Sequence, residues 1–297
     1  YPGAQVLVSR KGRVIYQKNF GYHEYDNKKK VEDSTVYDLA SLTKILASVP
    51  LLMELVDKKD LSLDTKLSEM LPEFKGSNKQ NLTIKELFSH YARLKAWIPF
   101  YRYTLNDSKT AISDQYYSNI ADKDFNVQVA EDLYLRRTYT DSIFKIIRDS
   151  DLLPKLEYKY SDLPYYLLKP YFEKKYDAPM EAIVEDRLYS PMGANHMGYL
   201  PLRKFSKDNI PPTEIDRTFR NQKVQGYVHD QGAAMLGGVA GHAGLFSNAN
   251  DVAKVMQMFL WKGFYGGKRF FNPDVFDQFN NCYYCGKRVR RGVGFDK

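Results

Sequence analysis

The order of hydrophobic and polar positions divides the chain into a strand-forming start and a helix-rich remainder. Residues 5–10 and 14–21 have the pattern of two strands, and Gly12 lies in the short turn between them, where a positive φ is wanted. Further along, the pattern predicts helices over residues 45–56, 83–90, 127–135, 140–148, 163–171, 180–188 and 249–260. Strands near the ends and helices between them favour an α+β fold over a regular βαβ alternation.

Several predicted helices carry signals for where they begin or break. Thr83 and Glu86 have the spacing of a capping box. Ser247 is expected to cap the last predicted helix, because serine is a favoured cap and lies just before the helical pattern. Pro50 lies inside the first predicted helix and should kink or interrupt it, because proline removes a backbone donor.

The composition is that of a folded, basic protein. The 297 residues are enough for a large core, and 43% of them are hydrophobic. The net charge of +8 is not concentrated, since the basic runs at 28–30 and 287–291 are short, which argues against a nucleic-acid partner. No apolar run is as long as a transmembrane helix. The chain opens directly in a strand without a signal peptide, so we expect a domain taken from a longer protein.

The two cysteines, Cys282 and Cys285, form a lone C-x-x-C motif. Such a pair could be a redox centre, half of a zinc site or two ordinary thiols. Structural zinc needs four ligands and the chain has no second pair, while a redox role usually comes with a βαβ context that is missing here. We therefore interpret both residues as ordinary thiols and expect no metal.

The sharpest chemical motif is Ser41-Leu42-Thr43-Lys44, at the start of the first predicted helix. A spacing of three places Ser41 and Lys44 on one helix face, so that the amine can reach the hydroxyl. The first turn of a helix also has unpaired N–H groups and a partial positive charge, which favour an alkoxide or an oxyanion. These are the requirements of an acyl-transfer nucleophile. A serine at a helix start is also commonly a simple cap, so the spacing alone leaves both interpretations open.

Two other segments could complete a site around this pair. Tyr160 and Asp162 are two residues apart, so in an extended turn both face the same way, and a tyrosine near a lysine can relay protons. His242 lies in a glycine-rich stretch that can approach a ligand closely. His242 and His229 could contact a substrate or only hold loops through hydrogen bonds, whereas we interpret His90 as structural.

These motifs, in this order, resemble the serine β-lactamase-like hydrolases with the penicillin-binding-protein fold, in the branch of class C β-lactamases, DD-peptidases and esterases. The resembling pieces are residues 3–6, 37–44, 63–72, 82–90, 160–162, 191–193 and 237–251. The resemblance implies an antiparallel sheet flanked by helices plus a helical lobe, all in one domain over 1–297. One lobe would comprise about 1–40 and 245–297, and the other about 41–244.

Carried over to this chain, the resemblance implies that Ser41 is the acylated nucleophile and Lys44 its general base or proton shuttle. Tyr160 would be the second acid/base group. Asp162 stands where the family's Tyr-x-Asn motif has asparagine, and its carboxylate should hold Lys44 protonated and make it a poorer resting base. Asp162 and three further residues are expected on the substrate side of the cleft, namely His242, His229 and Arg93.

The chain departs from the family's pattern in two places. Residues 89–94 read Ser-His-Tyr-Ala-Arg-Leu, so Arg93 replaces a small residue and can alter the cleft floor. The family's third motif is Lys-Thr-Gly or His-Thr-Gly on a late strand. His242-Ala243-Gly244 looks similar, but its neighbours match the loop and helix that precede the last strands. We therefore expect the C-terminal strands to be missing from this chain. Two alternatives remain open: the third motif follows Lys297 in a longer protein, or this version lacks half of its sheet and one of its two oxyanion donors.

The resemblance implies a serine hydrolase that acts on amides or esters without a cofactor, with cell-wall D-amino-acid peptides as the favoured substrates, in the periplasm or cell envelope. The most similar versions follow a β-N-acetylglucosaminidase-type glycoside hydrolase in Bacteroidetes envelope proteins, so such a domain is a possible N-terminal partner in the same polypeptide. The alternative is a non-catalytic module that binds peptidoglycan fragments or serves as a scaffold. A true antibiotic-degrading β-lactamase ranks third, because nothing in the sequence identifies a deacylating water.

Overall fold

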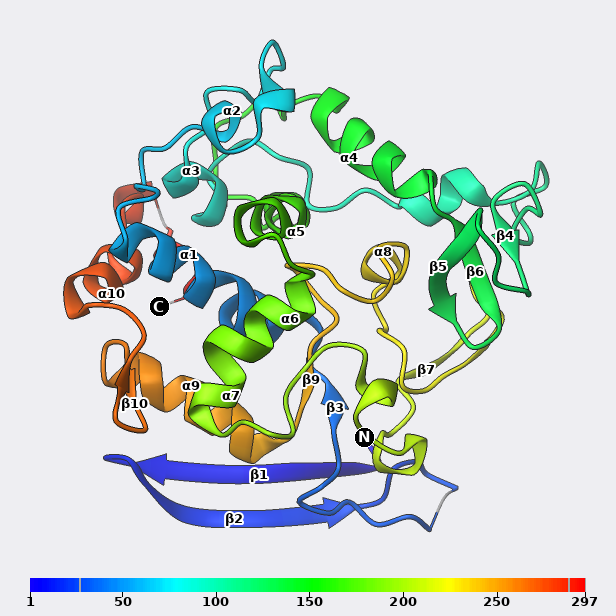
Figure 1. The fold of residues 1–297 in the computed structure, drawn as a ribbon, viewed down its shortest axis with the longest axis horizontal. Coiled ribbons are helices and arrows are strands. Elements are labelled where there is room, and N and C mark those ends of the chain that lie inside the picture. The colour runs from blue at the N-terminus through cyan, green and yellow to red at the C-terminus, as the bar shows by residue number, and fades with distance from the viewer. Residues whose placement is uncertain (27, 288, 297) are drawn as a thin grey trace.

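The structure is a computed structural model that describes residues 1–26, 28–287 and 289–296. The predicted hairpin is confirmed: strands β1 (Gly3–Arg10) and β2 (Arg13–Gly21) pair in antiparallel fashion along one side of the molecule (Figure 1). Gly12 in the turn has φ of 78°, in the left-handed region that glycine adopts without strain.

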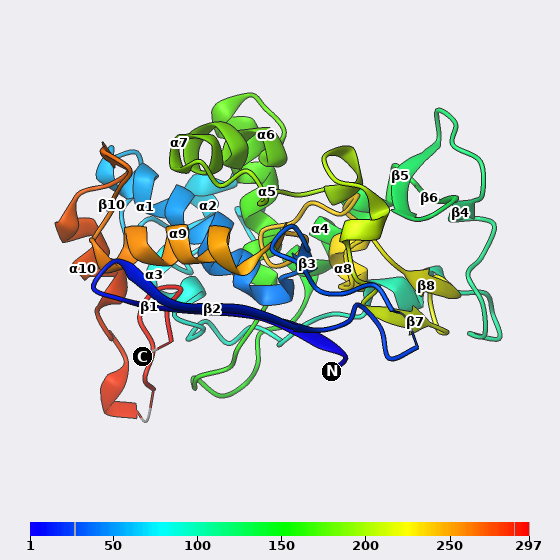
Figure 2. The same ribbon diagram turned by 90° about the horizontal axis from the view of Figure 1, so that it is seen from below.

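Helix α9 (Ala249–Leu260) lies against this hairpin, between the two strands and the other helices (Figures 1 and 2). The predicted bounds of this helix are confirmed, but its cap is not Ser247. The side chain of Asn248 accepts the N–H of Asp251, because Asn248 is the last residue with extended backbone before the helix. Gln5 of β1 accepts the N–H of Ala249 at 2.8 Å and so joins the hairpin to the helix start.

After the β1–β2 hairpin, the chain passes through β3 (Tyr37–Asp38) and enters the first helix. Strand β3 pairs with β9 (Phe246–Ser247). This helix has three parts: a 3₁₀ turn (Ala40–Leu42), a π-helical segment (Lys44–Ser48) and α1 (Val49–Asp57). Pro50 lies in the first turn of α1, directly after the π-helical segment. The predicted interruption at Pro50 is thus a change of helix type, since the first turn tolerates a residue without an N–H.

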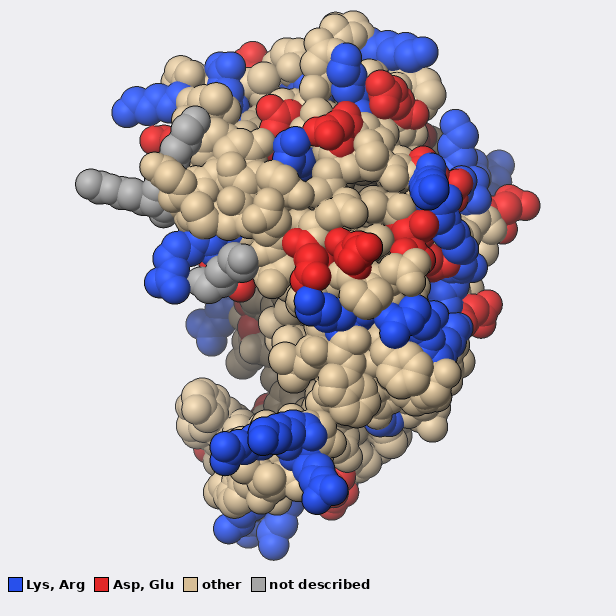
Figure 3. Space-filling view, turned by 90° about the vertical axis from the view of Figure 1, so that its left-hand side faces the viewer, with Lys and Arg blue, Asp and Glu red and all other residues tan. Residues whose placement is uncertain are grey.

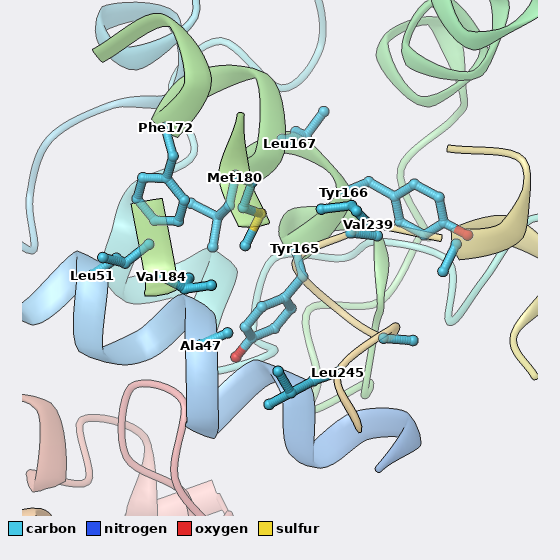
Figure 4. Close-up of a cluster of buried hydrophobic side chains, with 14 of the residues drawn as sticks. Ala47, Leu51, Tyr165, Tyr166, Leu167, Phe172, Met180, Val184, Val239 and Leu245 are labelled. Carbon is cyan, nitrogen blue, oxygen red and sulfur yellow. The ribbon is translucent and has the colours of Figure 1, made fainter. Parts of the chain in front are cut away.

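Several of the remaining helices lie around α1 (Figure 1). Side chains of α5 and α6 point toward α1 in the core, among them Phe172 and Val184 opposite Leu51 (Figure 4). The capping box of Thr83 and Glu86 is confirmed at the start of α3. The helices not yet given are α2 (Leu67–Met70), α3 (Ile84–Phe88), α4 (Tyr139–Asp149), α5 (Leu163–Tyr176), α6 (Met180–Val184), α7 (Ser190–Met192), α8 (Gln231–Ala234) and α10 (Pro273–Asn280).

The helix predicted over residues 127–135 is wrong. Strands β5 (Phe125–Ala130) and β6 (Leu133–Arg136) form an antiparallel hairpin there, and β4 (Tyr117–Ser118) pairs with the outer side of β6. In β6 the buried and half-buried residues alternate, which is the period of a strand and not of a helix. Asp132, with φ of 47°, makes the turn between the two strands. Two further short pairs are β7 (Glu214–Asp216) with β8 (Gln222–Val224) and β10 (Phe264–Tyr265) with β11 (Lys268–Arg269).

The interpretation of the two cysteines as ordinary thiols is also wrong, because Cys282 and Cys285 form a disulfide. The loop they close is held against the end of α3, where the ring of Tyr284 stacks on Tyr91 at 4.3 Å between centroids. The last described segment returns to the core, and the N–H of Gly294 donates to the carbonyl of Phe88 at 2.8 Å. The sequence could not decide the pairing, since a three-residue spacing permits a disulfide but does not require one.

The fold is α+β, with helices around small antiparallel sheets, as predicted. The division into two lobes stays a prediction. Within the described ranges, no helix has the length and hydrophobicity to cross a bilayer. Across the same residues, no three His, Cys, Asp or Glu side chains gather closely enough to hold a metal ion. The face in Figure 3 carries Lys and Arg interspersed with Asp and Glu over the helical body, while basic side chains dominate its lower edge.

Candidate active site

Ser41 and Lys44 meet as their spacing predicts. The Nζ of Lys44 donates to the Oγ of Ser41 at 2.9 Å. Ser41 is exposed in the 3₁₀ turn, whereas Lys44, in the π-helical segment, is only 2% exposed. A hydroxyl open to solvent therefore rests on an amine that the protein encloses, which is the arrangement required of a nucleophile and its proton acceptor.

Asp162 forms an ion pair with the same lysine, at 2.7 Å between Oδ1 and Nζ. Asp162 lies directly before α5, and its N–H donates to the carbonyl of Ala96 at 2.9 Å. Pro164 occupies the first turn of α5, where its missing N–H costs no helical hydrogen bond. The start of α5 thus fixes the carboxylate beside Lys44.

Tyr160 faces the same side as Asp162, as the two-residue spacing predicts. The Nζ of Lys44 lies 5.0 Å from the centroid of the Tyr160 ring. Ser161, between them, points the other way: it is buried and its Oγ donates to the carbonyl of Lys95 at 2.7 Å. Tyr160 itself is 37% exposed, so its phenol can meet both the lysine and a bound molecule.

His90 holds the segment that carries Tyr160. Its Nδ1 accepts the N–H of Ser161 at 3.1 Å, and its ring lies 4.5 Å from the Tyr160 ring. Burial, together with the charges of Arg291 and Lys44, keeps the pKa of His90 well below its usual value, so the imidazole is neutral and can accept this hydrogen bond. The contacts of His90 are internal, in line with its interpretation as structural.

Asp38 holds the backbone on the other side of Ser41, a role that the sequence did not reveal. Ala40, directly before Ser41, has φ of 50°, a left-handed conformation that is strained for alanine. Asp38 stabilises it by accepting the N–H of Ala40 at 2.8 Å, and it also accepts the N–H of His229 at 2.6 Å. Burial raises the pKa of Asp38, although these two hydrogen bonds oppose the shift.

His242 approaches Lys44 through its backbone. Its carbonyl accepts from the Nζ of Lys44 at 3.3 Å. Its side chain is buried, stacks on Tyr166 at 3.9 Å between ring centroids and lies 2.9 Å from Oδ1 of Asp230. The segment around His242 is irregular and not a strand, as expected from the rejection of His242-Ala243-Gly244 as the third motif. A substrate contact by the His242 side chain stays a prediction.

The contacts of His229 and Arg93 lead away from this cluster. The Nε2 of His229 lies 3.4 Å from a carboxylate oxygen of Glu214, and only its backbone N–H reaches toward Ser41, through Asp38. The Nε of Arg93 donates to the carbonyl of Leu153 at 2.5 Å, so this side chain anchors the loop before Tyr160. Their predicted substrate contacts are not tested by these positions.

A cavity of about 290 Å³ borders Ala40, directly beside the exposed Ser41. Asp38 and His229 lie on its wall, together with aromatic and proline residues that include Tyr37 and Pro212. The cavity offers room for a side group of a bound molecule beside Ala40, the residue that directly precedes Ser41.

The chain is similar to known proteins in sequence and in fold. A model of the Beta-lactamase family matches residues 1–272. An "N-acetylmuramyl-L-alanine amidase" of Bacillus subtilis (strain 168) is 31% identical over 304 residues, which cover 94% of this chain and 64% of that protein. A "Putative D-alanyl-D-alanine carboxypeptidase" of Escherichia coli (strain K12) is 30% identical over 306 residues, with the same coverage. The chain thus spans somewhat under two thirds of the length of these relatives.

Solved structures share the fold at low identity. A penicillin-binding protein homologue from Caulobacter crescentus has a TM-score of 0.69 at 16% identity, covering 99% of this chain and 75% of that one. The hydrolase EstCE1, described as having promiscuous acyltransferase activity, has a TM-score of 0.65 at 18% identity, covering 99% and 77%. From the family match and these likenesses, the chain belongs to the β-lactamase family, in the broad group of serine β-lactamases and penicillin-binding-protein-like proteins.

Proposed function

We propose that this chain is a serine hydrolase that opens amide or ester bonds through an acyl-enzyme at Ser41. The observation that carries the proposal is the contact chain from Ser41 through Lys44 to Asp162, at 2.9 and 2.7 Å. It joins an exposed nucleophile to a buried amine and a carboxylate. Ser41 and Lys44 lie in the first helix, whereas Asp162 lies directly before α5, far away in the sequence.

The proposed reaction begins with loss of the hydroxyl proton of Ser41. Lys44 can accept this proton only after giving up one of its own, and Asp162 is close enough to take it. Attack of the serine oxygen on the substrate carbonyl then gives a tetrahedral adduct, whose negative oxygen is favoured by the partial positive charge at the start of the helix. The leaving amine or alcohol takes a proton from Lys44 or Tyr160, and water later hydrolyses the acyl-enzyme.

Cell-wall peptides are the proposed substrates. The two curated relatives are named for activities on muramyl-L-alanine and D-alanyl-D-alanine bonds, which are bonds of the bacterial cell wall. With such a substrate, the protein would work in the periplasm or cell envelope. A glycoside hydrolase in the same polypeptide, processing the same polymer, stays a prediction from the resemblance.

Covalent labelling tests the nucleophile. Purified wild-type protein is treated with a fluorophosphonate probe and with a fluorescent penicillin, alongside Ser41→Ala. The matched control is Ser9→Ala, which removes an exposed serine hydroxyl on the hairpin. We expect wild type and Ser9→Ala to be labelled equally and Ser41→Ala not at all. Equal labelling of wild type and Ser41→Ala would overturn the assignment of Ser41.

Turnover separates the enzyme from a binding module. Release of D-alanine from a D-alanyl-D-alanine peptide, or of p-nitrophenol from its esters, is expected for wild type and lost in Ser41→Ala. A wild-type protein that is inert to both probes and both substrates, yet binds muropeptides tightly, would instead identify a non-catalytic module.

A further inference from the structure

A short segment, residues 228–230, is connected to both reacting side chains. On one side, the backbone N–H of His229 donates to Asp38 at 2.6 Å, and the other carboxylate oxygen of Asp38 accepts the N–H of Ala40 at 2.8 Å. Ala40 directly precedes Ser41 and has φ of 50°. The segment therefore helps to hold a strained backbone conformation that determines where Ser41 lies.

On the other side, the next residue of the segment reaches Lys44. Oδ1 of Asp230 lies 2.9 Å from Nε2 of His242, and the carbonyl of His242 accepts from the Nζ of Lys44 at 3.3 Å. Nδ1 of His242 is buried and has no hydrogen-bond partner among the described residues. Among the residues that the structure describes, the contact with Asp230 is therefore the polar interaction that fixes the His242 imidazole.

Close packing keeps the loop of His242 in place. A Cβ atom on Gly241 would lie 2.3 Å from the carbonyl oxygen of Tyr165, and the Gly241 carbonyl accepts from Oγ of Ser48 at 2.8 Å. The His242 ring stacks on the ring of Tyr166, a residue of α5. Small displacements of Asp230 would therefore be transmitted to the carbonyl that holds Lys44, since the loop has little free space around it.

The segment itself is anchored by a buried arginine. Arg220 donates through Nη1 to the carbonyl of Val228 at 2.6 Å and through Nη2 to that of His229 at 2.8 Å. Its Nε pairs with Asp216 at 2.8 Å. Asp230 in turn caps α8 by accepting the N–H of Ala233 at 2.7 Å. The carbonyls of Val228 and His229 and the side chain of Asp230 are thus held by hydrogen bonds, so both contacts toward the site start from a well-anchored segment.

We propose that residues 228–230 are a positioning element for the Ser41–Lys44 pair, with the Asp230–His242 contact as its decisive interaction. This inference rests on the proposed function, since it assigns the element to acylation at Ser41. Asp230 and His242 act through Lys44 and do not touch the reacting atoms. Asp230 also contributes a negative charge to the surroundings of Lys44, in addition to that of Asp162.

Charged and titratable groups face this element from several sides. Burial by itself would raise the pKa of Asp230, but the charges of His242 and Lys44 and the hydrogen bonds from His242 and Ala233 hold it well below its usual range, so Asp230 is ionised. The groups that face Lys44 or Asp230 from neighbouring elements are Asp38, His90, Tyr160, Asp162, Tyr165, Tyr166 and His242. Asp230→Asn removes the carboxylate charge of Asp230 from this set and keeps a side chain of the same shape.

The test compares Asp230→Asn with Asp230→Ala. Asparagine can still cap α8 and accept a hydrogen bond, whereas alanine can do neither. The readout is the pH dependence of the rate at which p-nitrophenyl acetate acylates Ser41. We expect Asp230→Ala to lower this rate by about 10²-fold relative to wild type, the usual effect of misplacing a reacting group by about 1 Å. Asp230→Asn should keep most of the wild-type rate. The acid limb of the Asp230→Asn profile should move to lower pH, because Lys44 loses a neighbouring negative charge.

Thr83→Ala is the matched control, since it also removes the side-chain cap of a short helix but lies outside the network described above. Its rate and pH profile should equal those of wild type. The proposal is overturned if Asp230→Ala loses no more rate than Thr83→Ala, or if the acid limb of Asp230→Asn stays where it is in wild type. If Asp230→Ala fails to fold, the Asp230→Asn profile decides.

Failure of the proposed function gives a different result. In that case wild type itself shows no acylation at Ser41, and the readout becomes the titration of the Lys44 ε-carbon signal, followed by NMR in selectively labelled protein. A lower titration midpoint in Asp230→Asn supports the positioning element even in an inert protein. An unchanged midpoint overturns it.

Discussion

Lys79 offers a quantitative test of the packing between α4 and the loop before α3. Its side chain is only 1% exposed, and its Nζ donates to the side chain of Asn78 at 2.8 Å, to the carbonyl of Arg148 at 3.1 Å and to the carbonyl of Ser150. The ammonium thus binds carbonyls at the C-terminal end of α4, where a positive charge is favoured. Burial nevertheless lowers the pKa of Lys79 from 10.5 to about 8, with the charge of Asp149 opposing the shift.

The size and sign of the pH effect follow from this shift. The unfolded chain keeps the Lys79 proton up to about pH 10.5, whereas the folded protein releases it near pH 8. Between these values the unfolded state binds more protons, so the free energy of unfolding rises with pH, and below pH 8 the contribution is constant. The full effect is on the order of 3 kcal/mol, since one pKa unit corresponds to about 1.4 kcal/mol. By pH 10 most of it, roughly 2.5 kcal/mol, should be present.

Lys79→Met removes the titrating group and keeps the length of the side chain. Urea unfolding at pH 7, 8, 9 and 10 gives the difference in unfolding free energy between wild type and variant. The contributions of all other titrating groups cancel in this difference. We expect this difference to grow by roughly 2–3 kcal/mol from pH 7 to pH 10, in favour of wild type. The exposed Lys75→Met, in the same loop, should show no such trend. A wild-type-to-Lys79→Met difference that stays constant over this range would refute the reasoning.

Two further substitutions test packing near the site and at the disulfide. Gly241→Ala should lower the free energy of unfolding by about 1–3 kcal/mol and slow the labelling of Ser41, because the new Cβ would lie 2.3 Å from the Tyr165 carbonyl oxygen and displace the neighbouring loop. Urea unfolding measures the first effect and the rate of labelling the second. A variant that matches wild type in both measurements would contradict the tight packing. Replacing Cys282 and Cys285 together by serine opens a very short loop, so the loss of unfolding free energy should not exceed about 2 kcal/mol. A loss above roughly twice that value in urea unfolding would mean that the disulfide supports more than its own loop.

Much of the fold follows from short stretches of sequence. The β1–β2 hairpin, the capping box at Thr83 and the bounds of α9 were all predicted correctly, because each depends on residues within a few positions of one another. The helix predicted over residues 127–135 failed for the opposite reason. That segment is a hairpin in which buried and half-buried residues alternate along β6, and a short apolar run does not distinguish a strand from a helix.

In the candidate site, too, the local features could be predicted and the long-range ones could not. Ser41 with Lys44, and Tyr160 with Asp162, were predicted to share faces from their spacings of three and two, and the contacts of Lys44 with Ser41, Asp162 and the Tyr160 ring agree with those faces. His242 was singled out from its glycine-rich surroundings, but the direction of its side chain could not be predicted. It turns inward to Asp230, and its backbone is what reaches Lys44.

The sequence by itself determined the elements whose physics is local: the turn at Gly12, the capping box at Thr83, and the spacing that presents Ser41 and Lys44 on one helix face. Only the tertiary structure decided what surrounds that pair. The carbonyl of His242 lies 198 positions from Lys44 in the chain, and the N–H of His229 lies 191 positions from Asp38. No local preference encodes such contacts, because they form only when the packing of the whole core brings these loops to the same place.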